Sequence, residues 1–268
     1  MGRGWYAGND RCRRSYNHGM PRLAIVTGAA RRVGRAVALE LARHGWDLLL
    51  THHTRGAETL QTAADARAAA GESGLTIDVR TAELDLSDLA AVEQFGRAHG
   101  SETTDALVLS AASYARTPFG SIDAATAERE MRINALAPLL LVQALAPALA
   151  RSALTGGGAV LAFGDIHAMG RPRRAFAPYL MSKSALHSMV EALALELAPA
   201  VRINGIAPGV VAWPDDAPTE ERASYESRIP LARPGTPDDA ARLVRSMIED
   251  MPYVTGTVIR LDGGRWLR

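Results

Sequence analysis

The sequence has a single cysteine, Cys12, among its 268 residues. A lone cysteine cannot form a disulfide within the chain or supply the several thiolates of a zinc site, so both are excluded. An excess of charge is also lacking, because 30 basic and 29 acidic residues leave a formal net charge of +1. This balance does not call for nucleic acid as a partner. No apolar run is long and charge-free enough to predict a membrane span, and we expect a cytoplasmic protein without a metal site.

Lysine is nearly absent, since 29 of the 30 basic residues are arginine and only Lys183 is lysine. Arginine can replace lysine wherever only a positive charge is needed. Its planar fork cannot replace a compact ammonium group where one is required. A single lysine can survive by chance, or it can mark a position whose chemistry depends on its ammonium group. The residues around Lys183 decide between these two interpretations.

The order of apolar and helical segments predicts the fold class. Residues 1–19 carry arginines and glycines but no apolar block, so we expect either a mobile extension or an upstream start ahead of Met20 as the natural initiator. From residue 20 to 268, short apolar runs alternate with stretches of helical periodicity. Continuous apolar strands that alternate with helices are typical of a parallel sheet covered on both faces. We predict a single α/β domain, a Rossmann-like, doubly wound sheet of about seven strands.

The expected elements can be given by residue range. Apolar runs predict strands at 23–26, 46–50, 75–84, 106–109, 159–163, 201–206 and 257–261. Periodicity predicts helices at 33–44, 57–70, 87–98, 128–149, 177–197 and 238–248. Ser87 is a suitable N-cap for the third of these helices.

A glycine turn follows the first expected strand. Gly28 permits a tight turn, and Gly34 permits close packing of helix on strand. Arg32 stands where the usual dinucleotide fingerprint has its middle glycine. A helix that begins directly after a strand offers free N–H groups and a favourable dipole to a phosphate. The turn therefore predicts a dinucleotide site, with Arg31, Arg32 and Val33 next to the phosphates.

The end of the second strand indicates which dinucleotide binds. An acidic residue there would hold the ribose hydroxyls of NAD, but the sequence has His53, Thr54 and Arg55. A basic cluster suits a 2′-phosphate, which favours NADPH, although the same residues could form a plain polar turn. After the third strand come Asp85 and Leu86, where Asp85 is placed to accept a hydrogen bond from the adenine amino group. Asp85 is equally suited to begin a helix.

Tyr179 and Lys183 lie four residues apart on one expected helix and therefore share a face. A phenol has an ordinary pKa of about 10, too high for proton exchange near neutral pH. A cation one turn away favours the phenolate, so we expect Lys183 to lower the pKa of Tyr179. This effect would explain why lysine, and not arginine, stands at position 183.

Together these motifs resemble the short-chain dehydrogenase/reductase family over residues 21–268. The resemblance implies that Tyr179 donates a proton, that Lys183 lowers its pKa and binds the nicotinamide ribose, and that Asn134 orders a water relay. It also implies that two segments flank the cofactor. These are Ser110 and Ala111 after the fourth strand, where the family usually has Asn-Asn-Ala-Gly, and Pro208 and Gly209 after the sixth.

Four departures from the general pattern resemble the pteridine reductases and dihydromonapterin reductases within that family. They are Arg32 in the glycine turn, the histidine-rich end of the second strand, Asp165 where the family usually has serine, and the tail 261–265. The resemblance implies that Arg32 contacts phosphate and pterin and that Tyr114 stacks on the pterin ring, although Tyr114 could be an ordinary core aromatic. Trp213 heads an expected substrate loop over about 211–232, whose polar part, 214–228, we expect to be mobile when empty.

Asp165 fits the chemistry of a pterin. Reduction of a ring C=N bond requires a proton at nitrogen as hydride reaches carbon, and a carboxyl group beside Tyr179 can pass that proton on. Asp165 could instead be a capping or loop aspartate.

Three functions follow from these patterns. The first is an NADPH-dependent reductase of a pterin substrate, with Arg32, Tyr114, Asp165, Tyr179 and Trp213 at the substrate. The second is a short-chain reductase of a carbonyl compound such as a keto-acyl thioester or ketone. The third is an NADP-binding module without chemistry. The resemblance further implies a homotetramer assembled through the helices near 132–150 and 176–197.

Overall fold

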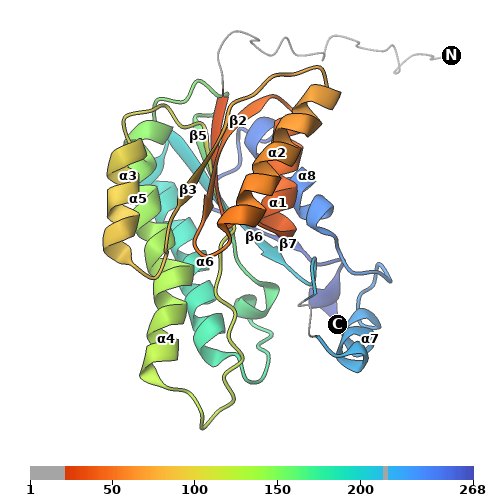
Figure 1. The fold of residues 1–268 in the computed structure, drawn as a ribbon. Coiled ribbons are helices and arrows are strands. Elements are labelled where there is room, and N and C mark those ends of the chain that lie inside the picture. Colours follow the sequence, from red (N-terminus) through yellow and green to blue (C-terminus); the bar gives the residue numbers. More distant parts are fainter. Residues whose placement is uncertain (1–21, 214–216) are drawn as a thin grey trace, which may run out of the picture.

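The computed structural model describes residues 22–213 and 217–268. Seven parallel strands form one sheet in the order β3-β2-β1-β4-β5-β6-β7 (Figure 1). The predicted single-domain, doubly wound α/β architecture is confirmed, whereas the expected extension 1–19 and the alternative start at Met20 lie outside the described residues. The strands are β1 (Arg22–Thr27), β2 (Trp46–His52), β3 (Val79–Glu83), β4 (Ala106–Leu109), β5 (Gly158–Phe163), β6 (Val201–Pro208) and β7 (Val258–Leu261).

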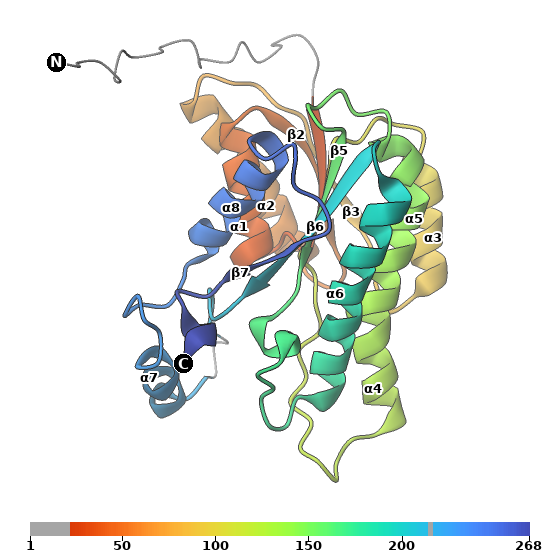
Figure 2. The same ribbon diagram turned by 180° about the vertical axis from the view of Figure 1, so that it is seen from behind.

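Helices cover both faces of the sheet, as the two opposite views show (Figures 1 and 2). Helices α1, α2 and α8 pack on one face, and α3, α5 and α6 pack on the other. Because both faces are covered, every residue of β4 and β5 is buried, which explains why these strands are continuously apolar. The helices are α1 (Arg32–Arg43), α2 (Gly56–Glu72), α3 (Leu89–His99), α4 (Ala124–Met131), α5 (Ala137–Leu149), α6 (Ala177–Leu197), α7 (Thr219–Glu226) and α8 (Pro237–Glu249).

The strand order reverses between β1 and β4, which are neighbours in the sheet although two strands separate them in the sequence. After β1 the chain adds β2 and β3 toward one edge of the sheet. It then crosses back to β4 and adds β5, β6 and β7 toward the other edge. In an open parallel sheet, this reversal opens a crevice at the carboxyl ends of the strands, where ligands bind. The topology thus places the turn after β1 and the segment after β4 on the two sides of one crevice.

Two predicted helix starts were wrong, and one helix was not predicted. The third helix begins at Leu89, and Asp88 rather than Ser87 is its N-cap, because the Asp88 carboxylate accepts hydrogen bonds from the N–H groups of residues 90 and 91. The helix expected at 128–149 begins earlier, at Ala124, after the N-cap Asp123. It is also interrupted by a π-helical turn at Arg132–Leu136. The segment expected to be a substrate loop contains the helix α7, whose acidic first turn favours a helix start.

One helical stretch, Ala124–Leu149, is long and apolar enough by length and composition to cross a membrane. The sequence-based expectation of no such run therefore does not hold on these two criteria. Half of its most apolar window is buried inside the protein. Leu141, Leu145 and Leu149 are fully buried in the core between α5 and the sheet, as in the core helix of a globular fold.

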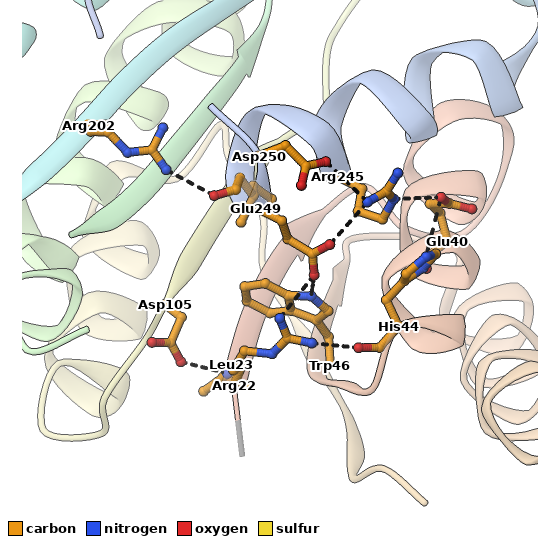
Figure 3. Close-up of polar contacts among 11 residues, drawn as sticks. Arg22, Leu23, Glu40, His44, Trp46, Asp105, Arg202, Arg245, Glu249 and Asp250 are labelled. Carbon is orange, nitrogen blue, oxygen red and sulfur yellow. Dashed lines mark hydrogen bonds and ion pairs between the residues drawn. The ribbon is translucent and has the colours of Figure 1, made fainter. Parts of the chain in front are cut away.

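A buried ion cluster fastens α8 to the start of the sheet (Figure 3). The side chain of Glu249 is only 4% exposed. One of its oxygens accepts hydrogen bonds from Arg22 at 3.0 Å and from the indole N–H of Trp46 at 2.8 Å. Its other oxygen accepts from Arg245 at 3.1 Å. Glu249 is the common acceptor of the cluster, so its loss would leave two cations and an indole N–H without that partner.

We expect Glu249→Ala to lower the free energy of unfolding by about 3–5 kcal/mol, the usual cost of breaking a buried, hydrogen-bonded ion pair from one side. Asp250→Ala is the matched control, because Asp250 is exposed and lies 3.4 Å from the same Arg245. Its loss should cost less than about 1 kcal/mol. Urea denaturation of both variants measures the difference, and equal losses would contradict this account of the cluster.

Candidate active site

A cavity of about 1320 Å³ opens at the carboxyl ends of the strands, where the strand order reverses. It receives residues from the turn after β1, from the ends of β2, β4, β5 and β6, and from α6 and α7. Most of the residues singled out in the sequence line it: Gly28, Arg31, Arg32, Val33, His53, Thr54, Arg55, Ser110, Ala111, Tyr114, Asp165, Tyr179, Pro208, Gly209 and Trp213.

Four of the singled-out residues do not line this cavity. Leu86 is buried in the core that α3 and α5 form with the sheet. Asp85 accepts hydrogen bonds from the N–H and hydroxyl groups of Ser87, so it orders the start of the next helix. Asn134 and Lys183 lie beneath the cavity wall, at 1% and 3% exposure. The predicted contact of Leu86 with a cofactor stays a prediction.

The glycine turn has the tight geometry that a dinucleotide cradle needs. Gly28 has φ +67°, and a Cβ there would lie 2.8 Å from the Cα of Ala111. A Cβ at Gly34 would lie 2.3 Å from the carbonyl oxygen of Gly28. The hydroxyl of Thr27 accepts hydrogen bonds from the N–H groups of Ser110 and Ala111 at 3.0 and 3.1 Å. This hydroxyl joins the end of β1 to the end of β4 and so fixes the width of the crevice.

Arg32 has a left-handed backbone, with φ +51°. The usual fingerprint has glycine at this position. A residue with a Cβ is strained in a left-handed conformation by about 1 kcal/mol or more, which explains that preference. Arg31, just before it, is the N-cap of α1 and makes no side-chain cap hydrogen bond. The first turn of α1 also has no acidic residue. The N-terminus of α1 therefore faces the cavity with an electrostatic preference for an anion, which fits the pyrophosphate of a dinucleotide.

The end of β2 forms one wall of the cavity. His53 Nε2 lies 3.5 Å from a carboxylate oxygen of Asp85. The guanidinium of Arg55 donates a hydrogen bond to Glu58 at 2.9 Å, and both side chains are about half exposed. An exposed pair of this kind contributes little to stability and separates easily. The wall therefore fits a phosphate on the ribose, with Arg55 as the charged donor.

Tyr179, Asp165 and Lys183 are brought together by α6 and the end of β5. The hydroxyl of Tyr179 donates a hydrogen bond to Oδ2 of Asp165 at 2.9 Å. The other oxygen of Asp165 accepts from the N–H of His167 at 2.7 Å and caps the short 3₁₀ turn Ile166–Met169. The capping interpretation of Asp165 is thus confirmed, while its role in proton transfer stays a prediction. Lys183 lies on the same side of α6 as Tyr179, with Nζ 6.0 Å from the ring centroid.

The expected direction of the Tyr179 pKa was wrong for this structure. Burial of the phenol, and then the negative charge and hydrogen bond of Asp165, raise the pKa of Tyr179 well above its ordinary value. Lys183 does not offset this, because burial lowers the pKa of its own ammonium group to about 8. Nζ of Lys183 donates a hydrogen bond to the carbonyl oxygen of Phe163 at 2.6 Å. The phenol therefore holds its proton firmly next to a carboxyl group.

Asn134 lies in the π-helical turn and is fully hydrogen-bonded. Its carbonyl oxygen accepts from the N–H of Ser113, and its amide group donates to Ser113, Glu130 and Ser182. Glu130 is 1% exposed and also accepts from the hydroxyl of Ser113. Sequence reasoning missed Glu130, although an acidic residue one turn before Asn134 was the available signal. The network ties the segment after β4 to α6, while a water relay through Asn134 stays a prediction.

Tyr114 is 45% exposed and faces the cavity, so it is not an ordinary core aromatic. One ring face stacks on Phe176, with centroids 4.8 Å apart and planes at 22°. Its edge meets Tyr179 at 4.8 Å and 88°. Phe176, which sequence reasoning missed, thus holds Tyr114 against the ring of Tyr179. Burial raises the pKa of Tyr114, and its hydroxyl accepts a hydrogen bond from Arg173 at 3.1 Å.

Trp213 and α7 close the far side of the cavity. The indole N–H of Trp213 donates to Glu226 at 2.9 Å, and its ring meets Tyr225 edge-on at 5.6 Å. These contacts fold part of the expected loop 211–232 into a packed helix. The expectation of mobility for residues 214–216 falls outside the described residues.

His187 lies one turn beyond Lys183 and was missed in the sequence. Its Nε2 accepts a hydrogen bond from the N–H of Asp165 at 3.4 Å. A Cβ at Gly164 would lie 1.9 Å from the same nitrogen, so a larger residue before Asp165 would have to displace the imidazole. Burial and the charge of Lys183 lower the pKa of His187 to about 4. The neutral imidazole is therefore the form that supports the backbone of Asp165 at neutral pH.

Comparisons with known proteins agree with this geometry. Residues 28–265 match the family model described as enoyl-(acyl carrier protein) reductase. The chain is 28% identical to pteridine reductase 1 of Leishmania tarentolae, over 90% of this chain and 95% of that protein. It is 32% identical to L-rhamnose 1-dehydrogenase (NAD(P)(+)) of Azotobacter vinelandii, over 90% and 94%. The crystal structure of acetoin dehydrogenase YohF from Salmonella typhimurium matches with a TM-score of 0.78 at 27% identity, covering 92% of this chain and 97% of that one.

The lowered pKa of His187 predicts a loss of stability in acid. The ordinary pKa of the imidazole is 6.5 and the folded value is about 4. Between these values the unfolded chain binds the proton and the folded chain does not, so the free energy of unfolding falls as the pH falls through this window. From pH 7 to pH 5, the wild type should lose about 2 kcal/mol more than His187→Gln. Urea denaturation at both pH values measures this, and equal losses would contradict the assignment.

Proposed function

The chain belongs to the short-chain dehydrogenase/reductase family of oxidoreductases, and from that premise we propose that it reduces a C=N bond of a pterin ring with NADPH. The observation that carries the proposal is the hydrogen bond from Tyr179 to Asp165 at 2.9 Å, beneath the exposed ring of Tyr114. A flat heterocycle stacked on Tyr114 would lie within reach of both groups. The similarity to pteridine reductase 1 supports the same substrate class.

Asp165 distinguishes ring reduction from ketone reduction. A ketone oxygen needs one hydroxyl donor as it gains negative charge, and a tyrosine alone serves that need. A C=N bond gains hydride at carbon and must gain a proton at nitrogen. A phenol with a raised pKa releases its proton poorly, so a carboxylate that can pass it a new proton from solvent is useful. The carboxylate of Asp165, which accepts the hydrogen bond from Tyr179, is placed for that relay.

Different residues of the cavity would bind the cofactor and transfer the proton. When bound, the reduced nicotinamide supplies the hydride. The N-terminus of α1 with Arg31 and Arg32 would hold the pyrophosphate, and Arg55 would hold a 2′-phosphate. The Tyr179–Asp165 pair gives one proton to the ring nitrogen and takes one back from solvent through the open cavity. Lys183, held by Phe163, supplies a compact ammonium group for the nicotinamide ribose.

A second candidate function is reduction of a carbonyl compound. It is supported by the similarity to L-rhamnose 1-dehydrogenase and acetoin dehydrogenase, whose names describe hydroxyl and carbonyl chemistry. The pair of Tyr179 and Lys183 serves that reaction equally well. Only Asp165 and the aromatic pair of Tyr114 and Phe176 favour the pterin over a ketone.

We also propose a homotetramer assembled through the long helices. Two large apolar side chains on α6 are strongly exposed in the single chain, Met181 at 65% and Leu195 at 85%. Burial of such side chains against a second copy is the usual explanation of an exposed apolar face. Sedimentation equilibrium tests the proposal, and a monomer at micromolar concentration would contradict it.

The cofactor preference is tested by Arg55→Ala. We expect at least a tenfold rise in KM for NADPH, because a charged hydrogen bond to a phosphate is lost, with little change for NADH. Arg43→Ala, which removes an equally exposed charge from the last turn of α1, is the control and should leave both values unchanged. Equal KM values of the wild type for the two cofactors would contradict the assignment of NADPH.

Asp165→Ser separates the two candidate reactions. We expect kcat/KM for a dihydropterin to fall about 100-fold or more, because the carboxylate that returns a proton to Tyr179 is removed. Activity toward a ketone should persist, since serine and Tyr179 suffice there. The measurement is NADPH oxidation with a dihydropterin and with a β-keto ester in parallel. Turnover of the keto ester but not of the dihydropterin by the wild type would assign the second function.

A further inference from the structure

A buried carboxylate lies beneath the cavity and has no part in the reaction described above. Among the eight residues of α4, Glu130 is the one that is buried, at 1% exposure. An acidic side chain is almost never fully buried without a partner, because burial removes its charge from water. An apolar residue at this position would pack α4 against α6 without that cost. The carboxylate of Glu130 therefore needs a compensating charge.

The hydrogen bonds of Glu130 come from neutral groups. One carboxylate oxygen accepts from the hydroxyl of Ser113 at 2.5 Å, and the other accepts from the amide group of Asn134 at 2.9 Å. Both oxygens act as acceptors, as in an ionised carboxylate. These two bonds hold the carboxylate in one orientation, but neutral donors do not balance its negative charge.

The amide group of Asn134 joins Glu130 to α6. Its nitrogen donates to the hydroxyl oxygen of Ser182 at 3.0 Å, and that hydroxyl donates to the carbonyl oxygen of Tyr179 at 2.7 Å. Ser182 is fully buried and directly precedes Lys183. Two neutral side chains thus connect Glu130 to the turn of α6 that carries Tyr179 and Lys183.

Lys183 is a buried cation in the same layer of the structure. It is 3% exposed, and Nζ donates a hydrogen bond to the neutral carbonyl oxygen of Phe163. Burial lowers the pKa of its ammonium group to about 8, close to neutral pH. The loss of one nearby negative charge would therefore leave much of the side chain uncharged.

The titratable groups that face Lys183 come from the end of β5, from α4 and from α6. Asp165 after β5 and Glu130 on α4 both raise the pKa of the ammonium group, and so oppose the effect of burial. Tyr179 and His187 lie one turn away on either side along α6. The pKa of Tyr179 is raised and that of His187 is lowered, so both are neutral at neutral pH. The two carboxylates are therefore the charges that stabilise the buried ammonium group.

We propose that Glu130 is a positioning residue of the active site, whose buried carboxylate holds Asn134 against α6 and is a second counter-charge for the ammonium group of Lys183. The proposal concerns the same site as the proposed function, but it does not depend on which substrate is reduced. Asp165 lines the cavity and shares a hydrogen bond with Tyr179, so its surroundings change when a substrate enters. Glu130 lies beneath the cavity, so its charge acts on Lys183 with or without a substrate.

The single lysine of the sequence makes a direct test possible. Protein that contains lysine labelled with ¹³C at Cε gives one lysine signal in NMR spectra, and its chemical shift follows the charge on Nζ. Glu130→Gln removes the negative charge and keeps the size of the side chain. The hydroxyl of Ser113 can then accept from the new amide group, while Asn134 still donates to the remaining oxygen. We expect the pKa of Lys183 to fall by at least about half a unit, because a nearby negative charge favours the ammonium form.

Glu128→Gln is the matched control, because it removes the same charge from an exposed position of the same helix. It should leave the pKa of Lys183 unchanged. Glu130→Asp keeps the charge and should leave that pKa near the wild-type value. An unchanged pKa in Glu130→Gln would overturn the proposal, and so would an equal fall in Glu128→Gln.

A second variant keeps the test decisive if Glu130→Gln does not fold. Glu130→Met combined with Ser113→Ala replaces the carboxylate and its hydroxyl donor together by apolar groups, a change that is often nearly neutral for stability. The amide group of Asn134 keeps the carbonyl oxygen of residue 113 and the hydroxyl of Ser182 as acceptors. We expect the same fall in the pKa of Lys183, and an unchanged value would contradict the role of Glu130.

The pH profile of catalysis separates an effect of charge from one of structure alone. If Lys183 acts as an ammonium group, activity is lost as the pH rises through its pKa, and a lower pKa moves this loss to lower pH. kcat/KM is measured over the neutral and alkaline range with the dihydropterin or keto ester that the wild type reduces. We expect the alkaline limb of Glu130→Gln to move to lower pH by the amount found in the NMR titration. Glu130→Asp should keep the wild-type limb.

Two results of the kinetic experiment have different meanings. A lower kcat in Glu130→Gln with an unmoved alkaline limb would overturn the proposal, because Glu130 would then act through structure alone. Absence of turnover with either substrate would remove the proposed function, while the titration of Lys183 would still decide the role of Glu130.

Discussion

The hydrogen bond between the buried phenol of Tyr179 and the carboxylate of Asp165 constrains everything around it. It keeps the phenol protonated, because the negative charge of Asp165 and the burial of the ring both raise the pKa of Tyr179. The second oxygen of Asp165 is occupied by the backbone of the following turn, so the carboxylate cannot rotate away. His187 holds the backbone of Asp165 from the other side. The two side chains therefore form one hydrogen-bonded unit rather than two independent groups.

The sheet explains how these groups meet. Asp165 follows β5, Tyr179 and Lys183 lie on α6, and Tyr114 lies beyond β4. Their distances along the chain are large, but the parallel order of the strands brings every carboxyl end to one edge. The hydroxyl of Thr27 then ties β1 to the segment after β4. A precise site thus follows from a regular scaffold whose strands carry no chemistry of their own.

Much of this arrangement was predictable from local patterns. The strands were found because both faces of the sheet are buried and their residues are continuously apolar. Tyr179 and Lys183 were paired correctly because helical spacing alone puts them on one face. The direction of the phenol pKa was missed, since it depends on burial and on Asp165, fourteen residues away in the sequence.

Other features were missed for similar reasons. Glu130 had a signal in the sequence, one turn before Asn134, whereas His187 is recognisable only when α6 is seen to pack against the end of β5. Helix α7 was interpreted as a loop because its short apolar face depends on Trp213 and Tyr225.

The complete burial of Lys183 has a practical consequence. Lys183 is the one lysine of the sequence and it is buried, so acylating reagents find no lysine on the described surface. Slow acylation of Lys183 would report the transient separation of α6 from β5. Its rate would measure how often the buried site opens.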